Sequence, residues 1–265
     1  MLTIIPPILS QKNFQEESAF LPQNLLREAR RQKELSNIMV PPVCVLDPDG
    51  DLLAYLRKKD QAVRHEGWAC YHTHLYICQI DEIQFGLIGQ AVGASFAVLL
   101  AEQLFVSGCE LLVSITSAGQ IAGEQPPPYF VLIDKAVRDE GTSYHYLPPS
   151  LYSHLGAELL STLQNAYENS PIAVVIGSSW TTDAPYRETA TAIDYYRTQN
   201  VLAVEMEAAA LYAFAQHHQQ PVVCFAHVTN QMGATDNDFE KGQHDGALDA
   251  LALLQATIKH LLPIT

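Results

Sequence analysis

Apolar and polar positions along the chain predict strands and helices in alternation. Short apolar runs bounded by turn-forming residues predict buried strands, and apolar residues recurring every three to four positions predict amphipathic helices. The predicted strands are 43–46, 72–79, 84–88, 111–115, 129–133, 172–176 and 222–228. The predicted helices are 23–35, 52–57, 95–106, 158–169, 189–197, 204–215 and 248–262. This alternation indicates an α/β fold in which helices cover both faces of a mostly parallel or mixed central sheet.

The chain divides into an N-terminal appendage, 1–40, and one large domain, 41–265. A length of 265 residues suits a single α/β domain, and no linker indicates a second one. The helix predicted in the appendage is basic and amphipathic, with Leu25, Leu26 and Ala29 on its apolar side. That side packs either on the body of the protein or on a neighbouring subunit, and both alternatives stay open at this point.

Composition and charge argue against some classes of binding partner. The formal net charge of −14 argues against a nucleic acid or an anionic membrane, and an anionic substrate would need locally placed cations. No apolar run is long enough to span a bilayer, and the first residues lack the basic region of a signal peptide. The five cysteines have no CxxC spacing, which is typical of reduced core residues in a cytoplasmic protein.

Neither a metal ion nor a dinucleotide cofactor is predicted. His72 and His74 lie on a predicted strand, and His217 and His218 lie near a helix end, but none has a partner at metal-binding spacing. The glycines of 86–93 follow the pattern G-x-x-G-x-x-x-G, whereas dinucleotide binding calls for G-x-G-x-x-G. Such glycines instead let the backbone come close to a ligand or to a neighbouring helix.

Two carboxylates begin the predicted helix 204–215. Glu205 and Glu207 lie in its first turn, where acids either complement the helix dipole or face a ligand. A polar loop, 177–188, precedes this helix, and the strand that follows it ends near Asn230. In an open α/β sheet such loops and strand ends border a small-molecule pocket. The neighbouring segments therefore favour a binding role for the two carboxylates.

Small polar residues follow another buried strand. The sequence Thr-Ser-Ala-Gly at 116–119 comes after the strand 111–115, at its carboxyl end. Exposed N–H groups without side-chain bulk are what an anion-binding or sugar-binding turn needs, although an ordinary turn has the same composition. The polar and aromatic segment 138–146 is too long for a plain connection, and we expect it to border the same pocket.

Taken together, these stretches resemble the nucleoside phosphorylase superfamily, from about Val43 to the C-terminus. The resemblance implies a three-layer α/β/α phosphorylase-type fold, with a central mixed sheet flanked by helices, in a homo-oligomer. It also implies cleavage of the bond between ribose and a nucleobase, with a nucleoside or nucleobase as the small-molecule partner. No cofactor is implied, other than inorganic phosphate as a possible co-substrate. The matching stretches are VEMEAAAL (204–211), RDEGTSYHYLP (138–148), TTDAPYRE (181–188), Ser-Ala-Gly (117–119) and VTN (228–230).

The resemblance implies roles for residues on the sugar side. Glu207 matches the carboxylate that accepts hydrogen bonds from the ribose hydroxyls, and Met206 matches the residue that packs under the sugar. Because the reaction passes through a ribosyl cation, a negative charge beside the sugar would stabilise its transition state. The predicted substrate-binding set on this side also includes Glu205, Ser117, Ala118 and Gly119, of which Ser117 matches a phosphate contact.

On the base side, the resemblance implies a second group of residues. Tyr186 is the candidate for stacking on the base, since Pro185 takes the place of the usual phenylalanine. Asn230 matches a position whose amide donates to the base, and we predict it as catalytic together with Glu207. Glu188 and His244 match residues that bind the base and the ribose 5′-hydroxyl. The choice between purine and pyrimidine stays open.

The sequence departs from the superfamily in the arginines that hold phosphate. The phosphate turn Gly-Asp-Pro-x-Arg corresponds to 46–50, so that Gly50 stands where the arginine is expected. Ser114 occupies the second arginine position, and His65 occupies the third, which is contributed across a subunit interface. Since bidentate arginine contacts normally hold phosphate, their loss should weaken its binding.

Three residues are candidate phosphate ligands in place of these arginines, namely Ser117, Arg64 and Arg138. We therefore predict a nucleoside phosphorylase-like enzyme that releases the free base and a ribose or phosphoribose product. A phosphate-independent nucleosidase is the alternative from the same superfamily. A nucleoside-binding protein without catalytic activity is the alternative from another class. Phosphate dependence and base release distinguish the three.

Overall fold

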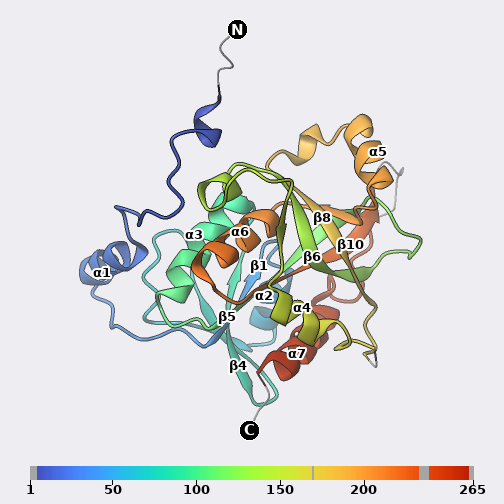
Figure 1. Cartoon of the computed structure of the whole chain (residues 1–265). Coiled ribbons are helices and arrows are strands. Elements are labelled where there is room, and N and C mark those ends of the chain that lie inside the picture. The colour runs from blue at the N-terminus through green and yellow to red at the C-terminus, as the bar shows by residue number, and fades with distance from the viewer. Residues whose placement is uncertain (1–4, 169, 233–238, 263–265) are drawn as a thin grey trace.

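The computed structural model describes residues 5–168, 170–232 and 239–262 (Figure 1). Its centre is one mixed β-sheet, in which ten strands are joined across these ranges. The strands are β1 (Val43–Asp47), β2 (Ala62–Arg64), β3 (Tyr76–Ile80), β4 (Ile83–Gly89), β5 (Leu111–Gln120), β6 (Tyr129–Asp139), β7 (Tyr152–His154), β8 (Val174–Thr182), β9 (Ala203–Glu205) and β10 (Val222–Gln231). The α-helices are α1 (Pro22–Lys33), α2 (Asp51–Lys58), α3 (Ala94–Phe105), α4 (Ala157–Leu163), α5 (Ala190–Thr198), α6 (Ala208–His218) and α7 (Ala247–Leu261).

The strand order closes half of the sheet into a ring. Along the sheet the order is β10-β6-β8-β9-β5-β1-β4-β3-β2, and β10 also pairs with β5, so five strands return on themselves. The neighbours β5, β1 and β4 are parallel, as are β5 and β10, whereas β9 runs antiparallel to β5. This arrangement brings the ends of β5, β9 and β10 together, and the predicted site residues 117–119, Glu205 and Asn230 lie on these ends.

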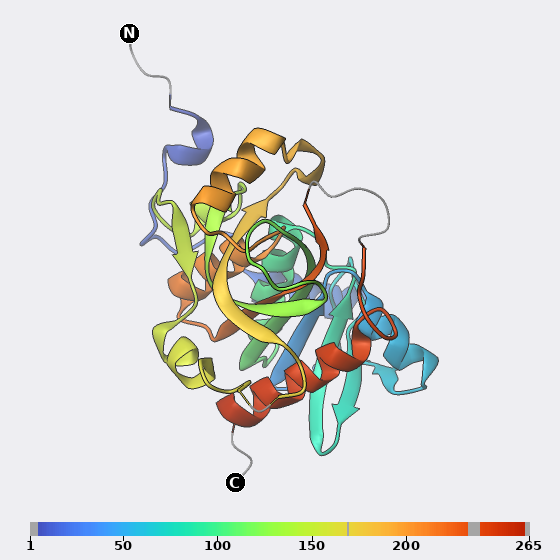
Figure 2. The ribbon, with the colours of Figure 1, turned by 90° about the vertical axis from the view of Figure 1, so that its right-hand side faces the viewer.

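Helices cover both faces of the sheet. The helices α3 and α6 pack against each other on one face, whereas α7 contacts α2 and α4 on the other (Figures 1 and 2). The apolar sides of β1, β4, β5, β6 and β10 form the main core together with the buried faces of these helices. The predicted α/β fold with a central mixed sheet between helices is confirmed.

The carboxylate-bearing helix begins later than predicted. Residues 203–205 form β9, which pairs with β8 on one side and with the end of β5 on the other. The helix α6 starts only at Ala208, and Glu207 is its N-cap residue. Local helix propensity is overridden here because the short strand satisfies backbone groups of both neighbouring strands.

Two strands are longer than their apolar runs. We expected a turn at 116–119 and a loop at 177–188, but β5 continues to Gln120 and β8 continues to Thr182. In both cases the polar residues keep pairing with neighbouring strands, so their backbone groups are satisfied inside the sheet. The strand predicted at 72–79 begins later than expected, because His72 and His74 precede β3.

The N-terminal helix packs on the body of the same chain. Leu26 and Ala29 of α1 are buried in a small cluster with Ala69. The Lys33 ammonium donates to the carbonyl oxygens of Ala69 and Cys70, at 3.1 and 2.7 Å. Of the two alternatives for the apolar side of this helix, the structure shows packing on the body.

Candidate active site

Two buried carboxylates meet where β9 gives way to α6. Glu205 accepts hydrogen bonds from the hydroxyls of Ser179 and Thr181, at 2.9 and 2.5 Å. Its other oxygen accepts from the backbone N–H groups of Glu207 and Ala208, both at 2.7 Å. Glu205 thus satisfies the start of α6 and fixes the neighbouring backbone. We predicted Glu205 as a substrate ligand, but the structure places it inside the fold with four internal donors.

Glu207 has the opposite environment. Its side chain is also buried, with 1% of the residue exposed, yet within the described residues only one of its oxygens is paired. The Gly93 N–H donates to Oε1 at 2.6 Å, whereas Oε2 has no hydrogen-bond partner among the described residues. Buried carboxylate oxygens without a partner are costly, so an unpaired one points to a ligand. The glycine-bearing segment before α3 therefore holds Glu207 and leaves one oxygen available.

Burial and a like charge change the acidity of Glu207. Removal from water raises the pKa of its carboxyl to about 8, and the neighbouring Glu205 acts in the same direction. The hydrogen bond from the Gly93 N–H and the nearby Thr116 side chain both act against this rise. Burial also raises the pKa of Glu205, against which its four donors act. Perturbation of this kind is typical of functional sites.

The ends of β5 and β10 form the part of the candidate site beside Glu207. Their parallel register places Ser117 next to His227, and Gly119 next to Asn230. A Cβ atom on Gly119 would lie 2.2 Å from the sulfur of Met232, so a larger residue there would require the Met232 side chain to move. Ala118 is buried between these neighbours. The structure thus brings together the predicted residues of both strands.

The remaining predicted substrate-binding residues differ in their exposure to solvent. Met206 is half-buried between β9 and α6. Tyr186 is 99% exposed, and its ring stacks on no aromatic ring among the described residues. Burial raises the pKa of the half-buried Glu188 to about 7. His244 is exposed, and its ring centroid lies 5.1 Å from that of Tyr55.

The two candidate phosphate arginines are placed differently. Arg138 is 4% exposed and donates to Ser143, Leu147, Pro148 and Ser150, so its guanidinium holds the segment after β6 and has no donor directed at Ser117. Arg64 is exposed on β2, which is separated from β5 by three strands. Within one protomer it lies far from Ser117, and the predicted contact across a subunit interface stays a prediction.

Replacement of Arg138 by lysine should therefore reduce stability. An ammonium group cannot reproduce the guanidinium fork, and each buried acceptor left unpaired costs about 1–3 kcal/mol. We expect Arg138→Lys to lower the free energy of unfolding by at least about 2 kcal/mol in urea titrations. The exposed Arg31→Lys serves as the matched control. Unchanged stability together with weaker use of phosphate would make Arg138 an anion ligand instead.

An acidic cavity beside Ser117 is the feature that the sequence did not reveal. It has a volume of about 20 Å³ and is lined by the turn after β1, the ends of β5 and β10, and the start of α7. The carboxylate of Asp49 accepts a hydrogen bond from the Ser117 N–H at 2.8 Å. The polar and charged residues that line the cavity are Asp47, Asp49, Asp51, Thr116, Ser117, His227 and Asp245. The aspartates of the segment 47–51 could have indicated an acidic cavity. From the sequence, however, we considered this segment only for the arginine that it lacks.

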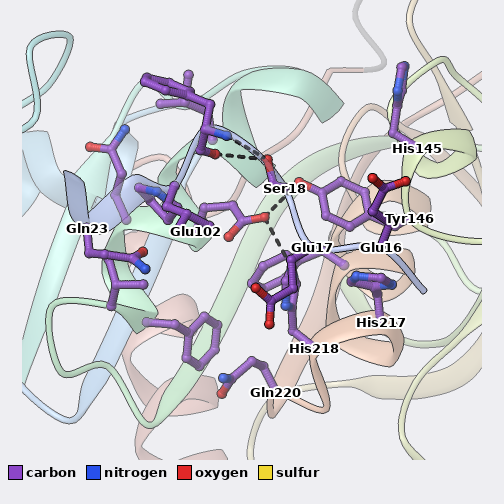
Figure 3. A pocket seen from close by; sticks show the side chains of 18 of the residues that line it. Glu16, Glu17, Ser18, Gln23, Glu102, His145, Tyr146, His217, His218 and Gln220 are labelled. Carbon is purple, nitrogen blue, oxygen red and sulfur yellow. Dashed lines mark hydrogen bonds and ion pairs between the residues drawn. The ribbon is translucent and has the colours of Figure 1, made fainter. Parts of the chain in front are cut away.

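A larger cavity lies elsewhere, between the segment 13–25 and the C-terminal end of α6 (Figure 3). It has a volume of about 930 Å³, and none of the predicted site residues lines it. One of its carboxylates, Glu102, already accepts from the Tyr146 hydroxyl at 2.9 Å and lies 3.3 Å from the His218 ring nitrogen (Figure 3). We place the candidate active site at Glu207, because an unpaired buried oxygen is a stronger indication than cavity size.

The described residues contain no group of three histidine, cysteine or acidic side chains arranged to hold a metal ion. Within the same ranges no helix is both long and apolar enough to cross a membrane. All five cysteines are buried and unpaired.

The family of the chain follows from comparisons with known proteins. The family model of the phosphorylase superfamily matches residues 42–259. A guanosine phosphorylase from Halorubrum lacusprofundi is 25% identical over 164 residues, which are 60% of this chain and 68% of that protein. The fold is similar to that of a purine nucleoside phosphorylase from Toxoplasma gondii in complex with immucillin-H, with a TM-score of 0.72, 14% identity, and coverage of 86% and 94%. A uridine phosphorylase from Vibrio fischeri ES114 gives a TM-score of 0.67, 17% identity, and coverage of 87% and 94%.

The chain therefore belongs to the phosphorylase superfamily. The family match covers most of the chain, and the relatives named above are a guanosine phosphorylase, a purine nucleoside phosphorylase and a uridine phosphorylase. The predicted resemblance, the phosphorylase-type fold and the prediction of an enzyme of this type are confirmed.

Proposed function

We propose that the protein cleaves the N-glycosidic bond of a purine nucleoside and releases the free base. The observation on which this rests is the buried Glu207, whose Oε2 has no partner among the described residues. A ribose presents two neighbouring hydroxyls as donors, which suits a carboxylate with one oxygen anchored and one available. Ionised, that carboxylate would also stabilise the ribosyl cation of the transition state.

The base would lie over the ends of β5 and β10. The Met232 side chain lies against Gly119, and the Asn230 amide in the paired position offers both a donor and an acceptor. The half-buried Glu188, with its pKa raised to about 7, supplies a carboxyl that can exchange a proton with the base near neutral pH. Purines expose ring N–H and N atoms that fit such a pair, and the guanosine phosphorylase relative agrees with this choice.

A panel of nucleosides tests the proposal. Inosine, guanosine, adenosine, uridine and cytidine would each be incubated with the protein, with and without phosphate, and free base would be measured by chromatography. We expect base release from at least one purine nucleoside and much slower release from the pyrimidine nucleosides. Binding of nucleosides without release of any base would show a binding protein, and preferential cleavage of uridine would overturn the purine assignment.

A further inference from the structure

The large cavity between the N-terminal segment and α6 has the size of a small-molecule site. Its volume is about 930 Å³, and small-molecule sites in proteins measure about 300–1,000 Å³. The segment 13–25 lines it on one side, and α3 and the C-terminal end of α6 line it on the other (Figure 3). The candidate active site lies at the opposite end of α6, where Glu207 is the N-cap. Because 11 helical residues span about 16 Å, the two sites are separate.

Aromatic rings make up much of the cavity wall. The ring of Tyr146 meets that of Phe214 edge-on, with centroids 5.9 Å apart, and Phe214 also lies 5.7 Å from Phe105. The segment 13–25 adds Phe14 and Phe20, of which Phe20 is 70% exposed. The faces of such rings attract cations that lie within about 6 Å of the ring centroid. The wall can therefore hold an apolar ring, a cationic group, or both.

The charged side chains on this wall are acidic. Three glutamates line the cavity, namely Glu16, Glu17 and Glu102. None of the described residues that line it is a lysine or an arginine, and Lys12, whose ammonium lies 2.7 Å from the Nδ1 of His145, is outside the lining. Burial lowers the pKa of His217, so this lining histidine is neutral at pH 7.5. A bound anion would face three carboxylates, whereas a bound cation would be attracted.

Glu102 has one carboxylate oxygen that is engaged and one that is not. Its Oε1 accepts from the Tyr146 hydroxyl and lies beside the His218 ring nitrogen (Figure 3). Within the described residues no donor reaches Oε2, and the side chain is 25% exposed. Burial acts to raise the pKa of Glu102, but the contacts with His218 and Tyr146 outweigh it and hold the pKa below its usual value. The carboxyl is therefore ionised at neutral pH, with one oxygen fixed and one unpaired.

These features together select the chemical class of the ligand. A metal ion would make no use of the rings, and the described residues contain no group of three side chains arranged to hold one. We propose that this cavity binds a small organic cation, in which a protonated amine lies at Glu102 and an apolar or aromatic body lies against the rings. The formal net charge of −14 also favours the approach of a cation. This site is independent of the reaction proposed at Glu207.

The test compares three probes of similar shape and different charge. At pH 7.5 benzylamine is cationic, benzyl alcohol is neutral and benzoate is anionic, and each would be titrated into the whole chain by isothermal titration calorimetry. We expect benzylamine to bind at least about 10-fold more tightly than benzyl alcohol, because hydrogen bonds to charged groups are the stronger ones. Benzoate should bind most weakly of the three.

Variants of single glutamates locate the bound amine. Glu102→Gln keeps the size of the side chain and should weaken the binding of benzylamine about 10-fold, with that of benzyl alcohol unchanged. The exposed Glu110→Gln removes a charge outside the cavity and is the matched control, which should bind benzylamine as the wild type does. Glu207→Gln should also keep wild-type affinity for benzylamine, since Glu207 lies at the other end of α6.

Several results would overturn this assignment. One is the absence of binding by every probe, and another is equal affinity for all three or tightest binding of benzoate. An equal loss in Glu110→Gln would show attraction by the overall charge alone, and a loss in Glu207→Gln would place the amine at the candidate active site. If Glu102→Gln fails to fold, the exposed Glu17→Gln replaces it and should also weaken the binding of benzylamine. None of these results depends on whether the protein cleaves nucleosides.

Discussion

Glu207→Gln is expected to lower kcat by roughly 10²-fold or more, which is the range for the loss of one preorganised electrostatic contact. Glutamine keeps the volume of the side chain and one oxygen for the Gly93 N–H. It removes the negative charge that would face the ribosyl cation. Because burial already favours the uncharged form of Glu207, the substitution should leave the thermal midpoint at pH 7 unchanged or raise it.

Glu205→Gln is the informative comparison, because the two residues are neighbours with opposite surroundings. Glu205 accepts four hydrogen bonds, and an amide would direct an N–H group at donors. That variant should lose about 1–3 kcal/mol of stability, measured by urea unfolding. The exposed Glu110→Gln controls for the loss of one charge. Wild-type activity of Glu207→Gln on every cleaved nucleoside would place the reaction elsewhere.

Much of the fold could be predicted from the sequence because its core strands are continuous apolar runs. The strands β1 and β10 and the helices α3 and α7 lie where the hydrophobic pattern predicts them. The ends of β5 and β8 could not be predicted in this way, since their buried residues are polar. Thr181 shows the reason, because its hydroxyl donates to Glu205 and accepts from the Ala209 N–H. The polar ends of these strands are stabilised by hydrogen-bond partners that are distant in the sequence.

The candidate site, like the fold, could be predicted from the sequence only in part. The resemblance identified Glu207 and Asn230, whose neighbourhood in the sequence is distinctive. The separation of roles between Glu205 and Glu207 depends on which of them meets internal donors, and that is a property of the packing. His227 was not identified, because a histidine within an apolar strand gives no signal of its own. Its stacking on Phe130 and the close approach of Gly246 appear only in three dimensions.

The activity should rise steeply with pH through the neutral range. If the ionised form of Glu207 stabilises the ribosyl cation, kcat/KM follows its ionisation in the free enzyme, where the pKa is raised to about 8. Between pH 5 and 7 the ionised fraction increases about tenfold per pH unit, and it levels off above pH 8. We expect a pH profile of kcat/KM with this slope. A flat profile over this range would contradict the assignment.

The stability of the protein should fall over the pH range in which its activity rises. The two measurements therefore test the same carboxyl group, that of Glu207. A carboxyl whose folded pKa is raised from 4.5 to about 8 contributes stability below pH 4.5, which is lost as the pH rises through 8. Urea unfolding should therefore show wild-type stability falling from pH 5 to 8, and the fall should be smaller by a few kcal/mol in Glu207→Gln. Thr116→Val removes a nearby hydroxyl that lowers the pKa of Glu207, so it should move the midpoint of kcat/KM to higher pH. An unmoved midpoint would assign the profile to another group, such as Glu188, whose pKa is also raised.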